Sequence, residues 1–320
     1  MCGAVSMSVS AEKLAAAFGK PLDKAFAERL AEIFTSPLID ADETRLTFAD
    51  GSNSAIVNHV PRFVPSDQYV KSFSFQWTEY RTIQHDSLHD SNFSKADFVL
   101  KTGLMPNQVV GKLVLDAGCG TGRVTDLLAE WGAMVVGADL SLSVDVAQQS
   151  LNHFDKAVVI QADIGALPFA PESFDIVVST GVLHHTPDTR EYTRRLVPLV
   201  KPGGELAIWV YGTHLAKRKN WIPLTSRLPY AAFNDWCQWI TGSARQQPDN
   251  HFLELLYPVF PFTVTHETRD RSALTLFDGY TPTYHGVHSE EEVESWFREF
   301  GFIDIRRNRI TTSIRGRKPL

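Results

Sequence analysis

Residues 112–211 carry short apolar runs that alternate with amphipathic stretches. Five runs have the length and aliphatic content of buried strands: 113–115, 133–138, 157–161, 174–179 and 205–211. Helices are expected between these strands, and the clearest are those over residues 141–151 and 188–199. Short buried strands that alternate with helices predict a parallel sheet with helices on both faces, and therefore an α/β fold.

The flanking segments have different patterns. Apolar residues at spacings of three and four predict helix over residues 11–34, and loose alternation over 45–64 indicates short strands or a loop. Ser289, followed by three glutamates, begins a last helix. We therefore expect four parts: an N-terminal helical cap over 1–110, a core over 111–211, an inserted lid over 212–287, and a closing helix with strands over 288–320.

Composition excludes several classes of protein. The chain has 320 residues, of which 43% are hydrophobic and 21% charged, as is typical of globular proteins. Its three scattered cysteines predict neither a disulfide framework nor a zinc cluster. The N-terminus lacks the pattern of a secretory signal and no apolar run could span a bilayer, so we expect a cytoplasmic protein without a membrane partner. The net charge of −6 argues against a nucleic-acid partner.

The loop after the first predicted core strand has the features of a ligand-binding loop. That strand ends at Asp116, and Gly118, Gly120 and Gly122 follow at alternate positions. Glycines allow a sharp turn and a close approach of the backbone to a ligand, and the helix that follows offers free N–H groups. Asp139 ends the second strand, where an acid accepts hydrogen bonds from ribose hydroxyls in folds of this kind.

A nicotinamide-dependent dehydrogenase also binds its cofactor with a glycine-rich loop after the first strand and an acid at the end of the second. The glycine spacing of its loop, however, is G-x-G-x-x-G. In this chain the third glycine comes one residue earlier, and position 123 is Arg. The carboxylate of Asp116 would repel a pyrophosphate and attract the ammonium group of a methionine moiety. These departures favour a methyltransferase over a dehydrogenase.

The segment Val114–Arg123 resembles the first motif of class I S-adenosylmethionine-dependent methyltransferases. The middle motifs of the type 11 subgroup are resembled by Gln161–Ile164, Leu167–Phe169, Ser173–Val177, Leu183–His185 and Lys201–Gly204. The resemblance covers about residues 112–211. It implies a seven-stranded, mostly parallel, doubly wound sheet, with S-adenosylmethionine as the cofactor and S-adenosylhomocysteine as the product.

The resemblance also implies roles for single residues. Asp116 and the loop glycines would contact the methionine part, Asp139 and Leu140 the ribose and adenine, and Asp163 with Ile164 the adenine. We add Thr180, at the end of the fourth strand, to the candidate cofactor contacts.

Upstream segments, including Ser72–Trp77 and Thr82–Ser87, resemble an N-terminal extension of some bacterial type 11 methyltransferases. Trp77 and Gln84 are therefore candidates for closing over the cofactor. The alternative is that they serve as a packed aromatic and a surface amide.

A methyl acceptor that must lose a proton needs a base. The histidine pair His184 and His185 follows the fourth strand, and Tyr284 and His285 precede the last helix, so these segments should face the methyl group from opposite sides. We take His184, Tyr284 and His285 as catalytic candidates; the alternative is that these side chains only shape the pocket. His285 and His288 lack a recognisable third ligand, so no metal site is expected.

The predicted activity is methyl transfer to a small molecule, such as an intermediate of secondary metabolism. Residues 212–287, with Trp221, Trp236 and Trp239, are expected to form the acceptor-binding region, because small-ligand pockets are mostly apolar. Two alternatives stay open: methylation of RNA or protein by the same core, and a cofactor-binding protein that has lost catalysis. The sequence does not determine the oligomeric state.

Overall fold

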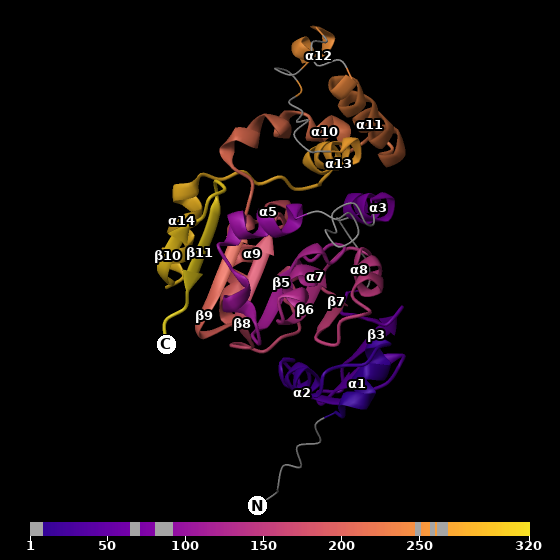
Figure 1. The fold of residues 1–320 in the computed structure, drawn as a ribbon, viewed down its shortest axis with the longest axis vertical. Helices are drawn as coiled ribbons and strands as arrows, with labels where there is room; N and C mark the ends of the chain where they lie inside the picture. The colour runs from indigo at the N-terminus through magenta and orange to yellow at the C-terminus, as the bar shows by residue number, and fades with distance from the viewer. Residues whose placement is uncertain (1–8, 65–70, 81–91, 247–250, 257–259, 261–267) are drawn as a thin grey trace, which may run out of the picture.

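A computed structural model describes residues 9–64, 71–80, 92–246, 251–256, 260 and 268–320 (Figure 1). The N-terminal region contains α1 (Ala11–Phe18), α2 (Lys24–Glu32), β1 (Leu38–Ala41), β2 (Arg45–Phe48), β3 (Asn53–Val57), β4 (Val60–Arg62) and α3 (Lys71–Glu79). Two further helices lead to the core: α5 (Phe93–Thr102) and α6 (Pro106–Val109).

The core alternates strands and helices, as the sequence predicts. Its elements are β5 (Leu113–Ala117), α7 (Arg123–Glu130), β6 (Met134–Asp139), α8 (Val144–Ser150), β7 (Ala157–Gln161), the short helix η2 (Ile164–Ala166), β8 (Phe174–Thr180), η3 (Leu183–His185), α9 (Thr189–Leu196), η4 (Val197–Leu199) and β9 (Val200–Trp209). The chain closes with α14 (Glu290–Glu299), β10 (Ile303–Arg307) and β11 (Ser313–Arg317). Ser289 caps α14 by accepting a hydrogen bond from the Glu292 N–H, as its sequence predicts.

The described strands form one sheet in the order β1-β2-β3-β4-β7-β6-β5-β8-β9-β11-β10. Neighbours run parallel from β4 to β9 and antiparallel at both ends of the sheet. The α/β fold with helices on both faces of a sheet is therefore confirmed, but the sheet has eleven strands rather than seven. Seven strands, from β7 to β10, form the expected core, and the N-terminal strands extend the sheet beyond β7.

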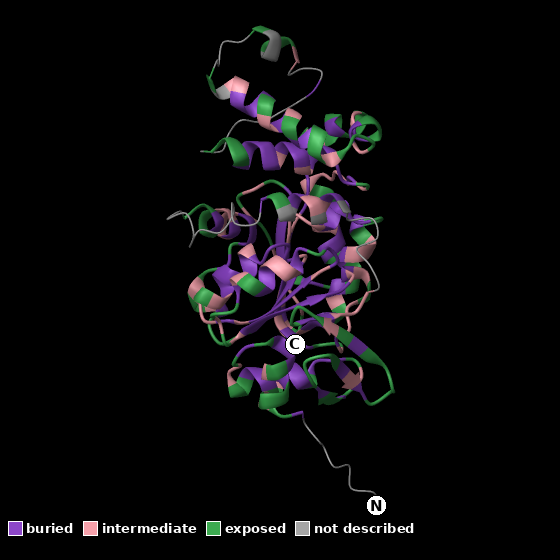
Figure 2. Ribbon diagram, turned by 90° about the vertical axis from the view of Figure 1, so that its right-hand side faces the viewer, coloured by how far each residue is buried: buried purple, intermediate pink, exposed green. Residues whose placement is uncertain are grey.

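Alternate residues of the central strands pack into two cores, one on each face of the sheet. On β5, Leu113 and Leu115 point to one core and Val114 to the other. Helices α9 and α14 cover the first face, and α5, α7 and α8 cover the second. Figure 2 shows the central strands as buried, with the exposed residues on the surrounding helices and loops. This packing places the carboxyl ends of β5, β6, β7 and β8 at one edge.

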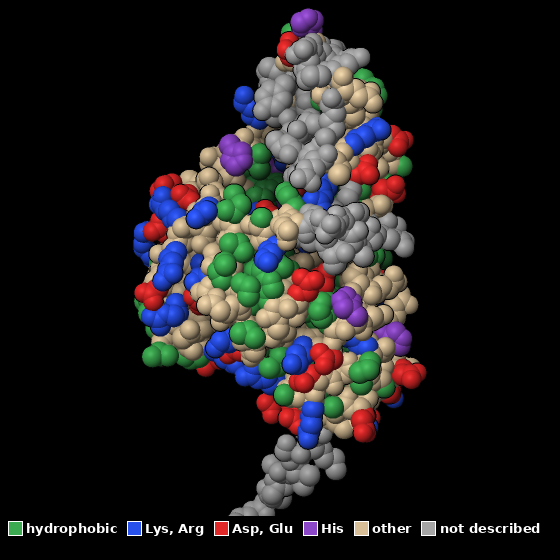
Figure 3. Space-filling model, viewed as in Figure 1, with side chains coloured by type: hydrophobic (Ala, Val, Ile, Leu, Met, Phe, Trp, Pro, Cys, Tyr) green, Lys and Arg blue, Asp and Glu red, His purple; other side chains and the backbone are tan. Residues whose placement is uncertain are grey.

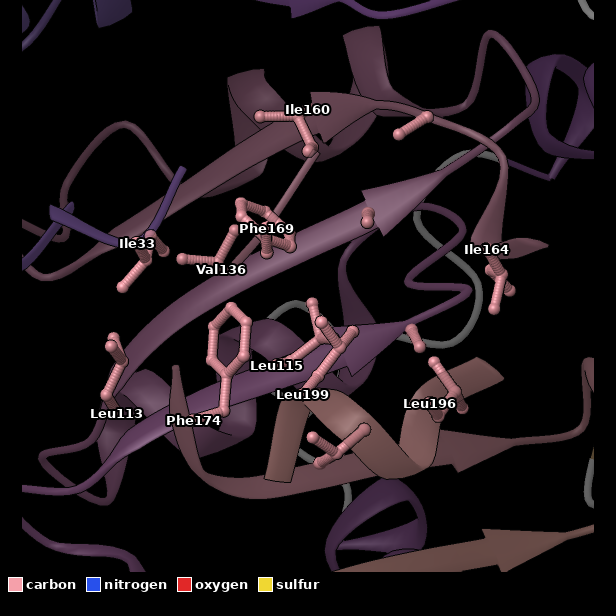
Figure 4. Close-up of a cluster of buried hydrophobic side chains, with 14 of the residues drawn as sticks. Ile33, Leu113, Leu115, Val136, Ile160, Ile164, Phe169, Phe174, Leu196 and Leu199 are labelled. Carbon is pink, nitrogen blue, oxygen red and sulfur yellow. The ribbon is translucent and has the colours of Figure 1, made fainter. Parts of the chain in front are cut away.

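The N-terminal region is not a helical cap over that edge. It contains four strands, and α2 lies near the amino ends of β7 and β8, where the Asp23 N–H donates to the Asp155 carbonyl over 2.9 Å. In Figure 4, Ile33 of this region lies beside Phe169 and Leu113 of the core. Residues 9–64 are therefore not a helical cap at the carboxyl ends: two helices are followed by four strands, of which β2, β3 and β4 lie in the segment 45–64, where the alternation indicates short strands or a loop. The helical pattern over 11–34 corresponds to two amphipathic helices, α1 and α2, and Gly19 ends the first with φ +63°.

The lid lies above the carboxyl ends of the strands (Figure 1). It contains η5 (Thr213–Asn220), α10 (Ile222–Thr225), α11 (Tyr230–Gln246), α12 (His251–Leu256) and α13 (Arg269–Tyr280). Helices α11 and α13 pack together around a separate apolar cluster that includes Phe233, Ile240 and Phe277. None of the helices in the described part of the chain is both long enough and apolar enough to cross a bilayer.

Candidate functional site

The glycine loop joins β5 to α7 at the carboxyl edge of the sheet. Gly118 and Gly122 have φ values of +92° and +89°, which side chains rarely adopt. A Cβ atom on Gly118 would lie 2.4 Å from the Val182 side chain. The loop can therefore follow this path, close under Val182, only with glycine at position 118.

Asp139 holds the loop from the neighbouring strand. One carboxylate oxygen accepts a hydrogen bond from the Gly120 N–H over 2.9 Å, and the other accepts from the Ser141 N–H and hydroxyl over 2.8 and 2.6 Å. A carboxylate has about four acceptor sites, so these three bonds leave one site for a ligand hydroxyl. Burial raises the pKa of Asp139, and these hydrogen bonds oppose that effect.

Asp116 is buried beneath the loop, with 2% of its surface exposed. Its carboxylate accepts a hydrogen bond from the Thr125 hydroxyl over 2.8 Å. Burial raises the pKa of Asp116 to about 7, although the Thr125 bond lowers it. A positively charged ligand group beside Asp116 would favour its ionised form.

One cavity joins the loop to the lid. Its empty volume is about 880 Å³, part of which is open solvent at the mouth. Eight predicted cofactor contacts line it: Asp116, Gly118, Gly120, Asp139, Leu140, Asp163, Ile164 and Thr180. Gly122 does not line the cavity; it begins α7 and packs against Ala147. The Trp77 side chain and the whole of Gln84 lie outside the described residues, so their predicted role stays a prediction.

His185 lines the lid side of the cavity. Its Nδ1 atom lies 3.0 Å from the Tyr284 carbonyl oxygen, which can only accept, so Nδ1 carries the proton. Burial lowers the pKa of His185, and the neutral ring therefore has a lone pair on Nε2. Nε2 is buried and has no hydrogen-bond partner. The ring of Phe73, from α3, lies 5.1 Å from the His185 ring.

The three residues predicted as catalytic lie close to this wall but not in it. His184 is fully buried, and its Nδ1 accepts a hydrogen bond from the Tyr211 N–H over 3.2 Å. Its ring stacks on that of Tyr211, with the centroids 3.6 Å apart. His285 is buried 5.1 Å from the Tyr211 ring, and Tyr284 presents its backbone carbonyl to His185. The structure therefore brings all three together around His185, which is the histidine that lines the cavity.

The sequence singles out His185 only as a member of the histidine pair, with His184 as the catalytic candidate. Other lining residues were not predicted as cofactor or catalytic contacts, among them Phe73, Asp278, Tyr192, Val182 and Arg123. Asp278 comes from α13 of the lid, and its carboxylate accepts from the Tyr211 hydroxyl over 2.7 Å and, more weakly, from the Gln76 side chain over 3.5 Å. Phe73 belongs to the segment Ser72–Trp77, which the resemblance to an N-terminal extension singles out. No local pattern marked Asp278.

The tryptophans of the lid do not line this cavity. Trp221 and Trp236 line a separate apolar groove between α10 and α11, and Trp239 is 50% exposed. The expectation that these tryptophans form the acceptor-binding region is therefore wrong, because Trp221 and Trp236 pack against the lid's own core and Trp239 is exposed. The lid contributes Asp278 to the cavity instead.

Two other features of the sequence take no part in the site. No group of three His, Cys, Asp or Glu side chains suited to a metal ion occurs among the described residues. Three arginines of the C-terminal strands are paired with acids: Arg307 contacts Glu290 and Glu294, Arg315 contacts Glu205, and Arg317 contacts Asp304. In Figure 3, blue and red side chains accordingly alternate along the edge formed by α14, β10 and β11.

Comparison with known proteins places this site in context. Residues 115–208 match the model of a family described as "Methyltransferase domain". A ubiquinone biosynthesis O-methyltransferase of Coxiella burnetii is 39% identical over 98 residues, which are 30% of this chain and 42% of that protein. A protein of the same description from Pseudomonas fluorescens is 30% identical over 140 residues, which are 42% of this chain and 58% of that protein.

The chain thus spans about half the length of the curated relatives it matches. Among solved structures, an S-adenosylmethionine dependent methyltransferase from Mesorhizobium loti is 28% identical to this chain. The match covers 32% of this chain and 47% of that one, with a TM-score of 0.30.

Proposed function

Residues 115–208 belong to the type 11 family of class I S-adenosylmethionine-dependent methyltransferases, and from this premise we propose that the chain methylates a hydroxyl group of a small molecule. His185 is the group that accepts the hydroxyl proton. The observation that carries this proposal is the unpartnered Nε2 of His185 in the wall of the cavity. The relatives are described as O-methyltransferases, which favours oxygen as the atom that is methylated.

The cofactor end of the cavity fits S-adenosylmethionine, the cofactor class of this family. Gly118 and Gly120 have no side chains that would keep a ligand away from the backbone. Asp139 has one acceptor site left for a ribose hydroxyl, and the Asp116 carboxylate can attract an ammonium group. Leu140, Asp163, Ile164 and Thr180 form the remaining wall. When bound, S-adenosylmethionine supplies a methyl group attached to a positively charged sulphur, and the sulphur is the leaving group that becomes a neutral thioether.

The acceptor end is the wall formed by Phe73, His185 and Asp278. A hydroxyl of the acceptor donates its hydrogen bond to Nε2 of His185, which holds the oxygen with a lone pair free for the methyl group. As the oxygen–methyl bond forms, the proton passes to Nε2, and the Tyr284 carbonyl stabilises the resulting imidazolium through Nδ1–H. Phe73 excludes water from this position and restricts the acceptor to a near-attack geometry.

A small acceptor fits better than RNA or protein. The lid covers the carboxyl edge of the sheet, and three arginines of the C-terminal strands, Arg307, Arg315 and Arg317, are paired with acids, which weakens their attraction for a nucleic acid. Loss of catalysis is the remaining alternative, and it predicts cofactor binding without turnover.

Isothermal titration of the full chain with S-adenosylmethionine, S-adenosylhomocysteine and NAD tests the first half of the proposal. We expect both sulphur compounds to bind and NAD not to bind; the opposite result would exclude a methyltransferase. Transfer of a labelled methyl group to a panel of phenols, amines and RNA tests the second half. Labelled methyl ethers should form, and labelled amines or RNA without ethers would contradict O-methylation.

A further inference from the structure

Asp278 brings a carboxylate of the lid to the acceptor end of the cavity. It lies in α13 and lines the cavity, as His185 does. One of its oxygens accepts from the Tyr211 hydroxyl over 2.7 Å, and the other makes only a long contact of 3.5 Å with the Gln76 side-chain nitrogen. Asp278 forms no ion pair with any residue that the structure describes. A carboxylate has about four acceptor sites, so Asp278 has capacity for a further donor.

The residues that contact Asp278 leave its negative charge uncompensated. Burial raises the pKa of Tyr211 well above its usual range, so this residue donates as a neutral hydroxyl. The Gln76 amide is neutral as well. The Tyr211 ring lies 5.2 Å from the His185 ring, so Tyr211 contacts both the carboxylate and the base. An acceptor of about the size of a tyrosine side chain can therefore reach both groups.

Both groups have unfilled capacity to accept hydrogen bonds. Nε2 of His185 is buried without a partner, and 5% of this residue is exposed. Asp278 has one oxygen without a short hydrogen bond. A buried acceptor without a donor is costly, so a ligand that supplies donors is favoured. A hydroxyl supplies the donor for His185, and an ammonium group, with three donors and a positive charge, suits Asp278.

The charges that line the cavity favour a cation. Its lining carboxylates are those of Asp116, Asp139, Asp163 and Asp278. Among the described lining residues, Arg123 is the one arginine or lysine, and it pairs with Asp97 over 3.2 Å. Asp116, Asp139 and Asp163 lie at the cofactor end. Asp278 is therefore the carboxylate that an acceptor meets, and it attracts a positive group and repels a negative one.

The buried cation Arg218 does not replace such a ligand. Its guanidinium packs over α13 at Gly279, where a Cβ atom would come within 2.4 Å of Nη1, and Arg218 does not line the cavity. Burial lowers the pKa of His185; the charge of Asp278 opposes this effect, and the charge of Arg218 adds to it. Both charges thus act on the base, but it is the carboxylate, and not the guanidinium, that a ligand meets in the cavity wall.

We propose that Asp278 binds a protonated amine of the methyl acceptor, so that the acceptor is a hydroxylated amine. This inference rests on the proposed function, because it places the hydroxyl at His185. The ammonium group donates a charge-assisted hydrogen bond to Asp278, and the ring of Phe73 in the same wall attracts the cation. A nitrogen held as ammonium has no lone pair, so the methyl group goes to the hydroxyl oxygen while the hydroxyl proton passes to His185.

The test uses three probes of similar shape that differ in charge: 4-hydroxybenzylamine, 4-hydroxybenzyl alcohol and 4-hydroxybenzoate. At neutral pH the first is a cation, the second is uncharged and the third is an anion. They are titrated into the full chain saturated with S-adenosylhomocysteine. We expect the amine to bind roughly tenfold or more tightly than the alcohol, the ratio typical of a hydrogen bond to a charged group. The acid should bind more weakly than the alcohol.

Asp278→Asn keeps the shape of the side chain and removes its charge, so the affinity for the amine should fall to that for the alcohol. The affinities for S-adenosylmethionine and S-adenosylhomocysteine should stay nearly unchanged. Asp278→Ser is a smaller uncharged replacement and serves the same purpose if the Asn variant does not fold. Asp270→Asn, at an exposed aspartate of the same helix, is the matched control and should retain the full preference for the amine.

Equal affinities of the wild type for amine and alcohol, no binding of the amine, tighter binding of the acid, or an unchanged preference in Asp278→Asn would each overturn the inference. A loss in Asp278→Asn of affinity for S-adenosylmethionine alone would assign the carboxylate to the positively charged sulphur and overturn it as well. Failure of the wild type to bind S-adenosylhomocysteine would instead contradict the proposed function, so the two failures are distinguishable.

Discussion

The Nδ1 atom of His185 lies 3.0 Å from the carbonyl oxygen of Tyr284, and this contact determines that the lone pair of the neutral ring is on the other nitrogen, Nε2. The two residues are 99 positions apart in the chain. The contact joins the core, which holds the cofactor site, to the segment that returns from the lid.

Replacement of this base should reduce turnover without affecting cofactor binding. His185→Ala is expected to lower kcat about a hundredfold or more, because a positioned base contributes that much, and to leave the Kd for S-adenosylmethionine nearly unchanged. His184→Ala and His285→Ala are expected to act through packing, with a smaller loss of kcat and a lower melting temperature. His153→Ala, at an exposed histidine, serves as control. Full turnover in His185→Ala would show that catalysis proceeds by positioning alone.

The dependence of kcat on pH should reflect the lowered pKa of the buried His185 side chain. Burial lowers the pKa of His185, and the charge of Asp278 opposes this. His185 is therefore neutral from pH 8 down to its ordinary pKa of 6.5, and kcat should fall only below that pH, when the ring is protonated. Asp278→Asn removes the opposing charge, so the acidic limb of the profile should move to still lower pH. A limb above pH 7 would contradict this assignment.

Asp139 should affect cofactor binding in two ways. Asp139→Ala removes an acceptor for the ribose and also the hydrogen bonds to Gly120 and Ser141 that hold the loop. We expect a cost of about 1.5–3 kcal/mol in binding, measured by titration with S-adenosylhomocysteine. Ser141→Ala keeps the acceptor and removes one supporting bond, so it should cost less than about 1 kcal/mol. Equal losses in both variants would mean that Asp139 only supports the loop.

Cofactor affinity should increase with pH around neutrality. Burial raises the pKa of Asp116 to about 7, so a fall from pH 8 to pH 6 protonates it and removes the charge that attracts an ammonium group. Thr125→Val removes the hydrogen bond that lowers this pKa, and the affinity profile should move to higher pH. Thr241→Val, where the hydroxyl bonds only within α11, is the control. An affinity that is constant from pH 6 to pH 8 would show that Asp116 does not contact a cation.

Alanine variants at Gly118 and Gly111 should distinguish the destabilisation caused by backbone strain from that caused by steric clash. Gly118→Ala places a methyl group 2.4 Å from Val182 at a φ of +92°, and we expect it to destabilise the protein by more than about 1 kcal/mol and to abolish cofactor binding. Gly111→Ala has a similar φ of +70° but open space around it, so it should show the strain alone. Val182→Ala should partly restore the Gly118→Ala variant, which thermal unfolding and titration would detect. No restoration would assign the effect to backbone strain together with the remaining contact to the Val182 Cβ atom at 2.8 Å.

Local patterns in the sequence predicted the core closely. The third strand, 157–161, has the predicted bounds, and eight of the predicted cofactor contacts line one cavity. The reason is that this chemistry is local: a strand ends in an acid, glycines turn the chain, and a helix begins, all within about fifteen residues. The parallel sheet then brings the carboxyl ends of successive strands to the same edge, so residues in corresponding positions meet.

The contacts between distant segments could not be predicted in this way. The N-terminal strands join the sheet through one parallel pair, Arg62 with Gln161, and nothing in the apolar pattern of residues 45–64 specifies that partner. Trp221 and Trp236 were expected to face the acceptor because they are aromatic and lie in the inserted segment. A helix has several faces, however, and the lid buries these rings in its own core.

The sequence by itself determined the fold class, the cofactor loop and the acids that serve it, because these depend on neighbours a few residues apart. The tertiary structure alone distinguished His185 from His184. These adjacent residues are chemically identical, and they differ only in what surrounds them: the Tyr284 carbonyl and the cavity in one case, and the Tyr211 N–H and ring in the other.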